Sequence, residues 1–121
     1  MALILIVDDS PTELHVMQKA LEKVGYRTAA AADGAEGVRM AREMAPDLIF
    51  MDIVMPGMNG YQATRALASD PRTRTIPIIM VTSKGQETDR IWGLRQGAVD
   101  YMVKPVSPDQ LVAKAQATLS A

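Results

Sequence analysis

Short apolar runs alternate with amphipathic stretches along this chain, and the alternation repeats five times. The apolar runs predict β-strands over residues 3–7, 26–31, 47–51, 76–81 and 99–103. The first, third and fourth runs are almost continuously apolar, which is typical of parallel strands buried on both faces of a sheet. The second run is more polar, as expected for a strand at an edge.

The stretches between these runs have helical spacing and recognisable ends. Ser10, followed by Pro11 and then by Glu13, predicts a capping box at the start of the first helix. Gly25 is the predicted end of that helix. Its predicted apolar face consists of Leu14, Met17, Leu21 and Val24.

The other four helices also have predicted caps and inward faces. Asp33 is the predicted N-cap of the second helix, and Ser107 with Gln110 predicts a second capping box before the fifth. The inward faces are Val38 and Ala41 in the second helix, Ala63 and Leu67 in the third (59–68), Ile91 and Leu94 in the fourth (86–96), and Leu111, Val112, Ala115 and Leu119 in the fifth.

This order of elements is (βα)5 with short connections. Because crossovers between parallel strands are right-handed, it favours a doubly wound α/β fold with a five-stranded parallel sheet, in the strand order 2-1-3-4-5. A chain of 121 residues is the length of one domain. We therefore expect residues 1–121 to form a single domain with no output domain.

Composition excludes several classes of function. The chain has 13 basic and 14 acidic residues without a basic stripe, which disfavours nucleic-acid binding. It has no cysteine, so disulfides and thiol chemistry are excluded. The N-terminal apolar run is too short for a signal peptide, and no stretch has membrane-spanning length. The expectation is a cytoplasmic protein that does not bind membranes.

Charged residues follow three of the predicted strands. Asp8 and Asp9 come after the first strand, Asp52 after the third and Lys104 after the fifth. Because ligands of open α/β sheets bind at the carboxyl ends of the strands, we expect these side chains to converge on one edge. Taken separately, acids there also suit a helix start or a turn. Together they suit Mg²⁺, and one carboxylate can serve as a nucleophile that forms an aspartyl phosphate.

Charge balance makes such a site dependent on metal. An aspartyl phosphate carries a charge of about −2, and two further carboxylates bring the edge to about −4. Mg²⁺ and Lys104 together supply about +3.

Thr82 and Ser83 after the fourth strand offer hydroxyl groups. Lys104 precedes Pro105 at a strand end, where we expect a cis peptide bond.

Four motifs in this order resemble the receiver domain of two-component response regulators. They are VDDS with Asp8 and Asp9, MDIVMPGMNG with Asp52, MVTS with Thr82, and the pair Lys104-Pro105. Each motif is weak alone, but the set is specific, and the resemblance covers essentially the whole chain. The length resembles the stand-alone CheY-like regulators. The segments DDSPTE and QETDRIWGLRQGAVDY are similar to regulators of type IV pilus twitching motility.

The resemblance implies a role for each residue of the edge. Asp52 is the implied phosphoacceptor, while Thr82 and Lys104 contact the phosphoryl group. Mg²⁺ is the implied cofactor, and its implied ligands are the carboxylates of Asp9 and Asp52, the carboxylate of Asp8 through water, and the backbone carbonyl of Val54. The implied protein is not an enzyme with turnover on a separate product, because it catalyses only its own phosphorylation and dephosphorylation.

The resemblance also implies partners and a switch. Tyr101 is the implied aromatic switch residue, read out by the surface of the fourth helix, fifth strand and fifth helix. A CheA-like histidine kinase and a downstream protein target are the implied partners of a monomer. Trp92 points away from Ile91 and Leu94 at helical spacing. It is either a partly exposed anchor for a partner or a side chain lying on the adjacent helix.

Two residues near the site vary among such regulators. Val54 is two residues past Asp52, and being apolar it does not orient an attacking water, which predicts slow self-dephosphorylation. Lys84, two residues past Thr82, either shields the phosphoryl group or positions a partner.

Other functions remain as alternatives. The chain could be a phosphate sink that competes for the kinase, or a receiver-like module that is never phosphorylated. A flavodoxin-like protein binding FMN needs a phosphate-cradling loop after the first strand, where Asp8 and Asp9 would repel phosphate. Phosphatases that resemble haloacid dehalogenases carry their nucleophile in a D-x-D pattern after the first strand, which differs from the DDS found here.

Overall fold

The computed structural model describes residues 1–83 and 85–120, and in these ranges five strands alternate with five helices. The elements are β1 Leu3–Val7, α1 Pro11–Lys23, β2 Arg27–Ala31, α2 Gly34–Met44, β3 Leu48–Met51, α3 Gly60–Ala68, β4 Ile78–Thr82, α4 Glu87–Gln96, β5 Asp100–Val103 and α5 Pro108–Leu119. The strands are parallel and lie in the order β2-β1-β3-β4-β5, which confirms the predicted fold.

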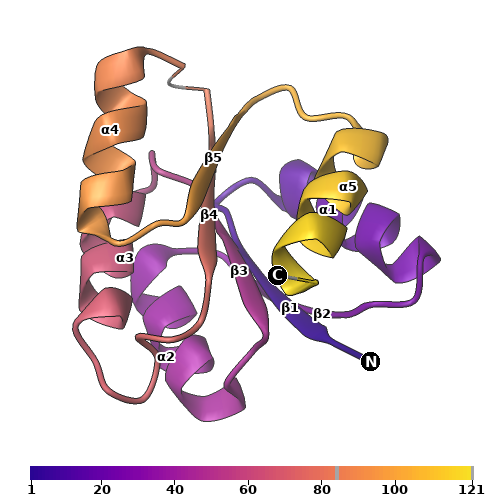
Figure 1. The fold of residues 1–121 in the computed structure, drawn as a ribbon, viewed down its shortest axis with the longest axis horizontal. Coiled ribbons are helices and arrows are strands. Elements are labelled where there is room, and N and C mark those ends of the chain that lie inside the picture. The colour runs from indigo at the N-terminus through magenta and orange to yellow at the C-terminus, as the bar shows by residue number, and fades with distance from the viewer. Residues whose placement is uncertain (84, 121) are drawn as a thin grey trace.

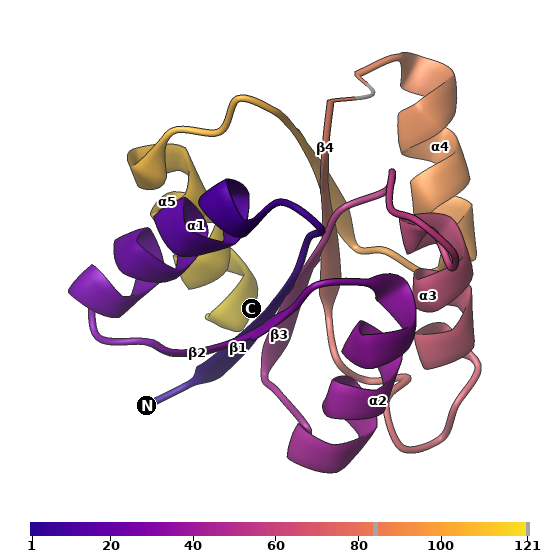
Figure 2. The same cartoon turned by 180° about the vertical axis from the view of Figure 1, so that it is seen from behind.

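Helices cover both faces of the sheet. α1 and α5 pack on one face, and α2, α3 and α4 pack on the other (Figure 1 and, from behind, Figure 2). Successive side chains of a strand point to opposite faces, so Ile4 and Ile6 join the core under α1 and α5, whereas Leu5 and Val7 join the other. Within the part of the chain described, every helix is too short or too polar to cross a bilayer.

The start of α1 differs from its prediction in one hydrogen bond. The Ser10 hydroxyl accepts from the Glu13 N–H at 3.3 Å, as an N-cap should. The Ser10 N–H, which would complete the predicted capping box with Glu13, donates instead to Asp8 Oδ1 at 2.9 Å. The capping box predicted at Ser107 and Gln110 is confirmed. Through the bond from the Ser10 N–H, the carboxylate of Asp8 is held at the start of α1.

The predicted inward faces of two helices are partly wrong. Val24 is exposed because α1 ends at Lys23, so Val24 leaves the helical repeat. Ile91 is also exposed, and Gly93 is the buried residue of α4. A Cβ on Gly93 would lie 3.4 Å from Met80 Cγ, so α4 approaches β4 through a residue without a side chain. That approach turns Ile91 outward.

Candidate functional site

Backbone hydrogen bonds hold the expected site residues at the carboxyl edge of the sheet. The Asp8 N–H donates to the last carbonyl of β2 at 3.1 Å, and the Asp52 N–H donates to the Val7 carbonyl at 2.9 Å. The Lys104 N–H donates to the Thr82 carbonyl at 2.8 Å. These bonds extend the sheet pairing one residue past the ends of three strands. They therefore fix the backbone positions of Asp8, Asp52 and Lys104 at this edge.

Three carboxylates meet at this edge, as the sequence predicts. Asp8, Asp9 and Asp52 each offer an oxygen, and these oxygens lie within 4.8 Å of one another. Asp8 and Asp52 are buried, with exposed fractions of 2% and 6%, whereas Asp9 is exposed. A set of hard oxygen donors with one side open to solvent fits Mg²⁺, which takes one or two protein carboxylates and keeps several waters.

Lys104 supplies positive charge to the same group. Its Nζ lies 2.8 Å from Asp8 Oδ2 and 3.6 Å from Asp52 Oδ1. Burial by itself lowers the pKa of Lys104, but the hydrogen bond to Asp8 and the charges of Asp52 and Asp8 more than offset burial and leave that pKa raised. The ammonium group is therefore charged at every pH at which the acids ionise. The Lys104–Pro105 peptide bond is cis, as expected.

The carboxyl group of Asp52 has an unusual affinity for protons. Burial raises its pKa to about 6, and the negative charge of Asp8 adds to this effect. Lys104 and the Ile53 N–H, which donates to Asp52 Oδ1 at 2.9 Å, act in the opposite direction. At neutral pH Asp52 is thus a carboxylate whose negative charge is only partly compensated. Binding of a cation, or bond formation with an electrophile, would reduce this uncompensated negative charge.

Thr82 and Tyr101 lie on β4 and β5, the two strands that follow β3 across the sheet. Thr82 is the last residue of β4 and is fully buried. Tyr101 is partly buried on β5 opposite Met80, and its ring lies beside Gly93 of α4. Burial, followed by electrostatic repulsion from Tyr61 in its ionised form and from Asp89, raises the pKa of Tyr101 to about 12. Its phenol is therefore neutral at neutral pH.

Trp92 lies on the side of α4 that faces α3. Its ring meets the ring of Tyr61 edge-on, with 6.4 Å between centroids and an interplanar angle of 74°. About half of Trp92 is exposed. The side chain is thus both partly exposed and in contact with the adjacent helix, and its role as a partner anchor stays a prediction. Val54 is exposed after Asp52, and Lys84 lies outside the described residues.

Backbone donors are the part of the site that the side-chain pattern did not reveal. The Ser10 N–H donates to Asp8 Oδ1, and the Ile53 N–H donates to Asp52 Oδ1. A backbone N–H leaves no mark in a sequence, because every residue except proline has one. The one sequence feature that could have indicated these backbone donors is the short loop that directly follows each acid.

Comparison with known proteins agrees with this geometry. Residues 4–116 match the family model of the response regulator receiver domain. Protein PilH of Pseudomonas aeruginosa is 53% identical over 120 residues, which cover 99% of each chain. The solved chemotaxis protein CheY4 of Vibrio cholerae is 31% identical with a TM-score of 0.93, covering 98% of each chain.

A second solved structure carries a metal ion. The receiver domain of a Pseudomonas aeruginosa sensor histidine kinase is 34% identical with a TM-score of 0.92, covering 99% of this chain and 98% of that domain. That structure has a magnesium ion coordinated in its active-site cleft. The present chain, with its doubly wound sheet and its acidic edge, therefore belongs to the response regulator receiver domain family and is a phosphorelay receiver.

Proposed function

We propose that this chain is a stand-alone response regulator that accepts a phosphoryl group on Asp52 from a histidine kinase. The observation that carries the proposal is the position of Asp52, a buried carboxylate with a raised pKa that lies beside Asp8 and Lys104. The match over 99% of PilH supports a protein in which residues 1–121 act as one receiver domain.

The transfer step exchanges one bond for another. An oxygen of the Asp52 carboxylate attacks the phosphorus of a phosphohistidine on the kinase, and the P–N bond breaks as the P–O bond forms. The electron pair of the P–N bond goes to the imidazole nitrogen. Lys104 faces the negative charge of the transferred group, and the Ile53 N–H fixes the orientation of Asp52.

Asp8, Asp9 and Asp52 are the residues that would hold Mg²⁺. We assign the carboxylates of Asp9 and Asp52 and the backbone carbonyl of Val54 as direct ligands, and Asp8 as a ligand through water. Bound Mg²⁺ supplies positive charge that offsets the oxygens of the phosphoryl group.

The readout uses differential contacts of the phosphoryl group with two states of the domain. Thr82 contacts the phosphoryl group, and Tyr101 responds as the switch residue next to α4.

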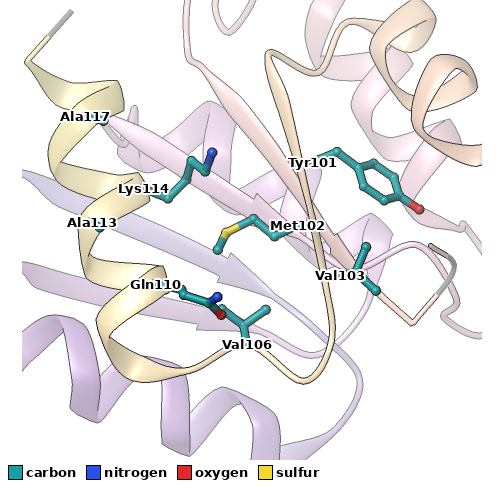
Figure 3. A pocket seen from close by; sticks show the side chains of 8 residues that line it. All are labelled: Tyr101, Met102, Val103, Val106, Gln110, Ala113, Lys114 and Ala117. Atoms are coloured by element: carbon teal, nitrogen blue, oxygen red, sulfur yellow. The ribbon is translucent and has the colours of Figure 1, made fainter. Parts of the chain in front are cut away.

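A surface hollow of about 470 Å³ lies over β5 and α5, with Met102 and Lys114 among its lining residues (Figure 3). In Figure 3 the ring of Tyr101 points away from α5, whereas Met102 points towards it. A target protein that binds this face would sense both strand β5 and helix α5.

The similarity to PilH supports a pathway of chemotaxis-like or twitching-motility control. We infer a CheA-like kinase as donor, a downstream protein target as receiver of the signal, and action as a monomer in the cytoplasm. A role as phosphate sink uses the same chemistry without a target. A protein that binds the phosphorylated form more tightly distinguishes the regulator from the sink.

Phosphotransfer is the direct test of the proposed function. Phosphorylated histidine kinases of the same organism are mixed with the purified chain, with Mg²⁺ and after chelation of Mg²⁺. We expect label to pass to the chain only with Mg²⁺, and peptide mapping to place it at Asp52. No transfer from any of the kinases would refute the proposal.

Replacement of Val54 tests control of the phosphoryl lifetime. An apolar side chain cannot align water for attack on the aspartyl phosphate, whereas an amide can, so Val54→Asn is expected to shorten the lifetime. The measurement is loss of label after the kinase is removed. Val54→Leu is the matched control that keeps the side chain apolar. An unchanged or longer lifetime in Val54→Asn would contradict this role.

Replacement of Trp92 tests it as a partner anchor. Because Trp92 is half exposed and is not among the residues that contact the carboxylates, Trp92→Ala is expected to weaken binding to the cognate kinase about tenfold or more, while labelling by a small acyl phosphate stays unchanged. Binding is measured by calorimetry. Trp92→Phe, which keeps an edge contact with Tyr61, is the control. Loss of both properties, or of neither, argues against the anchor.

A further inference from the structure

The first residue of α3 touches the backbone of the residue that we assign as phosphoacceptor. A Cβ added to Gly60 would overlap the carbonyl oxygen of Asp52, and it would lie 2.8 Å from the Asp52 carbonyl carbon and 2.7 Å from Ile53 Cα. The Gly60 N–H donates to the Ile53 carbonyl at 2.8 Å. The loop that leaves β3 therefore returns to its own starting point, and it closes there through a residue without a side chain.

The first residue of α2 touches the same loop from outside. A Cβ added to Gly34 would overlap the carbonyl oxygen of Met58, and it would lie 3.2 Å from both the carbonyl carbon and the Cβ of Met58. The loop of residues 53–59 is thus held at two points. Gly60 holds its inner end at Asp52, and Gly34 holds its outer end at Met58.

Both approaches are backbone against backbone, which sets these glycines apart from others in the chain. Gly57 in the same loop has φ +72° and nothing within 4 Å of an added Cβ. Glycine is favoured there by the left-handed backbone conformation and not by a close contact. Gly93 leaves 3.4 Å to a flexible methionine side chain. A carbonyl oxygen has no rotamer by which to avoid a methyl group. An added Cβ at Gly60 or Gly34 must therefore move the loop itself.

We propose that Gly60 and Gly34 are positioning residues that set where the Asp52 carboxylate and the Val54 carbonyl stand for Mg²⁺ binding and phosphoryl transfer. The inference rests on the proposed function of Asp52. A methyl group at Gly60 displaces the start of the loop by roughly 1 Å, because non-bonded carbon atoms need about 3.5 Å. A misplacement of about 1 Å lowers the rate of a positioned reaction about 100-fold.

The test compares Gly60→Ala and Gly34→Ala with Ala66→Gly, a control that weakens helix α3 at a position away from the loop. Mg²⁺ affinity is measured by calorimetry, phosphotransfer at saturating Mg²⁺, and stability by urea unfolding. Backbone amide shifts of the metal-free proteins report the position of the loop directly.

Gly60→Ala is expected to weaken Mg²⁺ binding about tenfold, to slow phosphotransfer about 100-fold and to move the amide signals of Asp52 and Ile53. Gly34→Ala acts in the same direction but less strongly, and it keeps the test open should Gly60→Ala not fold. Ala66→Gly changes stability alone. Wild-type Mg²⁺ affinity in both alanine variants, or losses no larger than those of Ala66→Gly, would overturn the inference. A wild type that binds Mg²⁺ but takes no phosphoryl group refutes the proposed function and leaves the Mg²⁺ comparison valid.

Discussion

Asp52→Asn is expected to abolish phosphorylation and, at the same time, to stabilise the metal-free protein at neutral pH. An amide oxygen is too weak a nucleophile to take the phosphoryl group, so labelling by the kinase disappears. The gain in stability has a separate cause. The wild-type carboxylate is buried beside Asp8, which raises its pKa from 3.8 to about 6, and the neutral amide avoids that repulsion.

The stabilisation by Asp52→Asn has a defined pH dependence. Between pH 4 and 6 folded Asp52 keeps a proton that the unfolded chain releases, so wild-type stability falls as the pH rises through this window. Well above pH 6 the full difference is present, roughly 3 kcal/mol. Urea unfolding in chelator should therefore show the variant to be more stable at pH 7.5, with the advantage disappearing near pH 4.

Asp70→Asn is a matched control with the opposite sign. Hydrogen bonds from Arg72, together with one from Arg42, hold the pKa of Asp70 well below its usual range. Asp70→Asn should therefore lower stability at neutral pH and leave phosphorylation unchanged. Labelled Asp52→Asn protein would contradict the assignment of Asp52 as phosphoacceptor. An Asp52→Asn variant less stable than wild type at pH 7.5 would contradict the raised pKa of Asp52.

Lys104→Ala is expected to destabilise the metal-free protein by about 2–4 kcal/mol and to slow phosphotransfer about 100-fold. Removal of the ammonium leaves the buried carboxylates of Asp8 and Asp52 without their nearest cation. Mg²⁺ neutralises the same carboxylates, so saturating Mg²⁺ should restore much of the lost stability but not the rate. Mg²⁺ should then stabilise the variant more than it stabilises the wild type.

The exposed pair of Lys114 and Asp100 provides the control. Their charged atoms are also 2.8 Å apart, but both side chains are more than one third exposed. Lys114→Ala should cost less than about 1 kcal/mol and should not alter phosphotransfer. Both variants are compared by urea unfolding with and without Mg²⁺. Equal losses in the two variants would show that Lys104 acts as an ordinary surface lysine.

The sequence was sufficient for those features that depend on local pattern or strand order. Buried parallel strands read as apolar runs, and their carboxyl ends meet at one edge, so the clustering of Asp8, Asp9, Asp52 and Lys104 followed from topology alone. Helix caps were predictable because an N-cap side chain bonds a backbone group only three residues away.

Features that depend on contacts between distant elements were not predictable. The exposure of Ile91 follows from the approach of Gly93 to Met80, and helical periodicity gives a glycine no weight in the apolar face. The ring contact of Trp92 with Tyr61 joins two helices whose relative rotation the sequence does not specify. The missing capping box at Ser10 arises because Asp8 competes for the same N–H.

The glycine contact of α4 has a consequence for how such domains diverge. Because Gly93 is the one fully buried residue of α4 and Leu94 is only partly buried, no large side chain of this helix is fully buried in the core. Mutations on its outer positions, such as Glu87, Arg90 and Arg95, can accumulate without repacking the sheet. After gene duplication, two copies of such a receiver can acquire different recognition surfaces while they keep one common chemistry, which insulates parallel signalling pathways from each other.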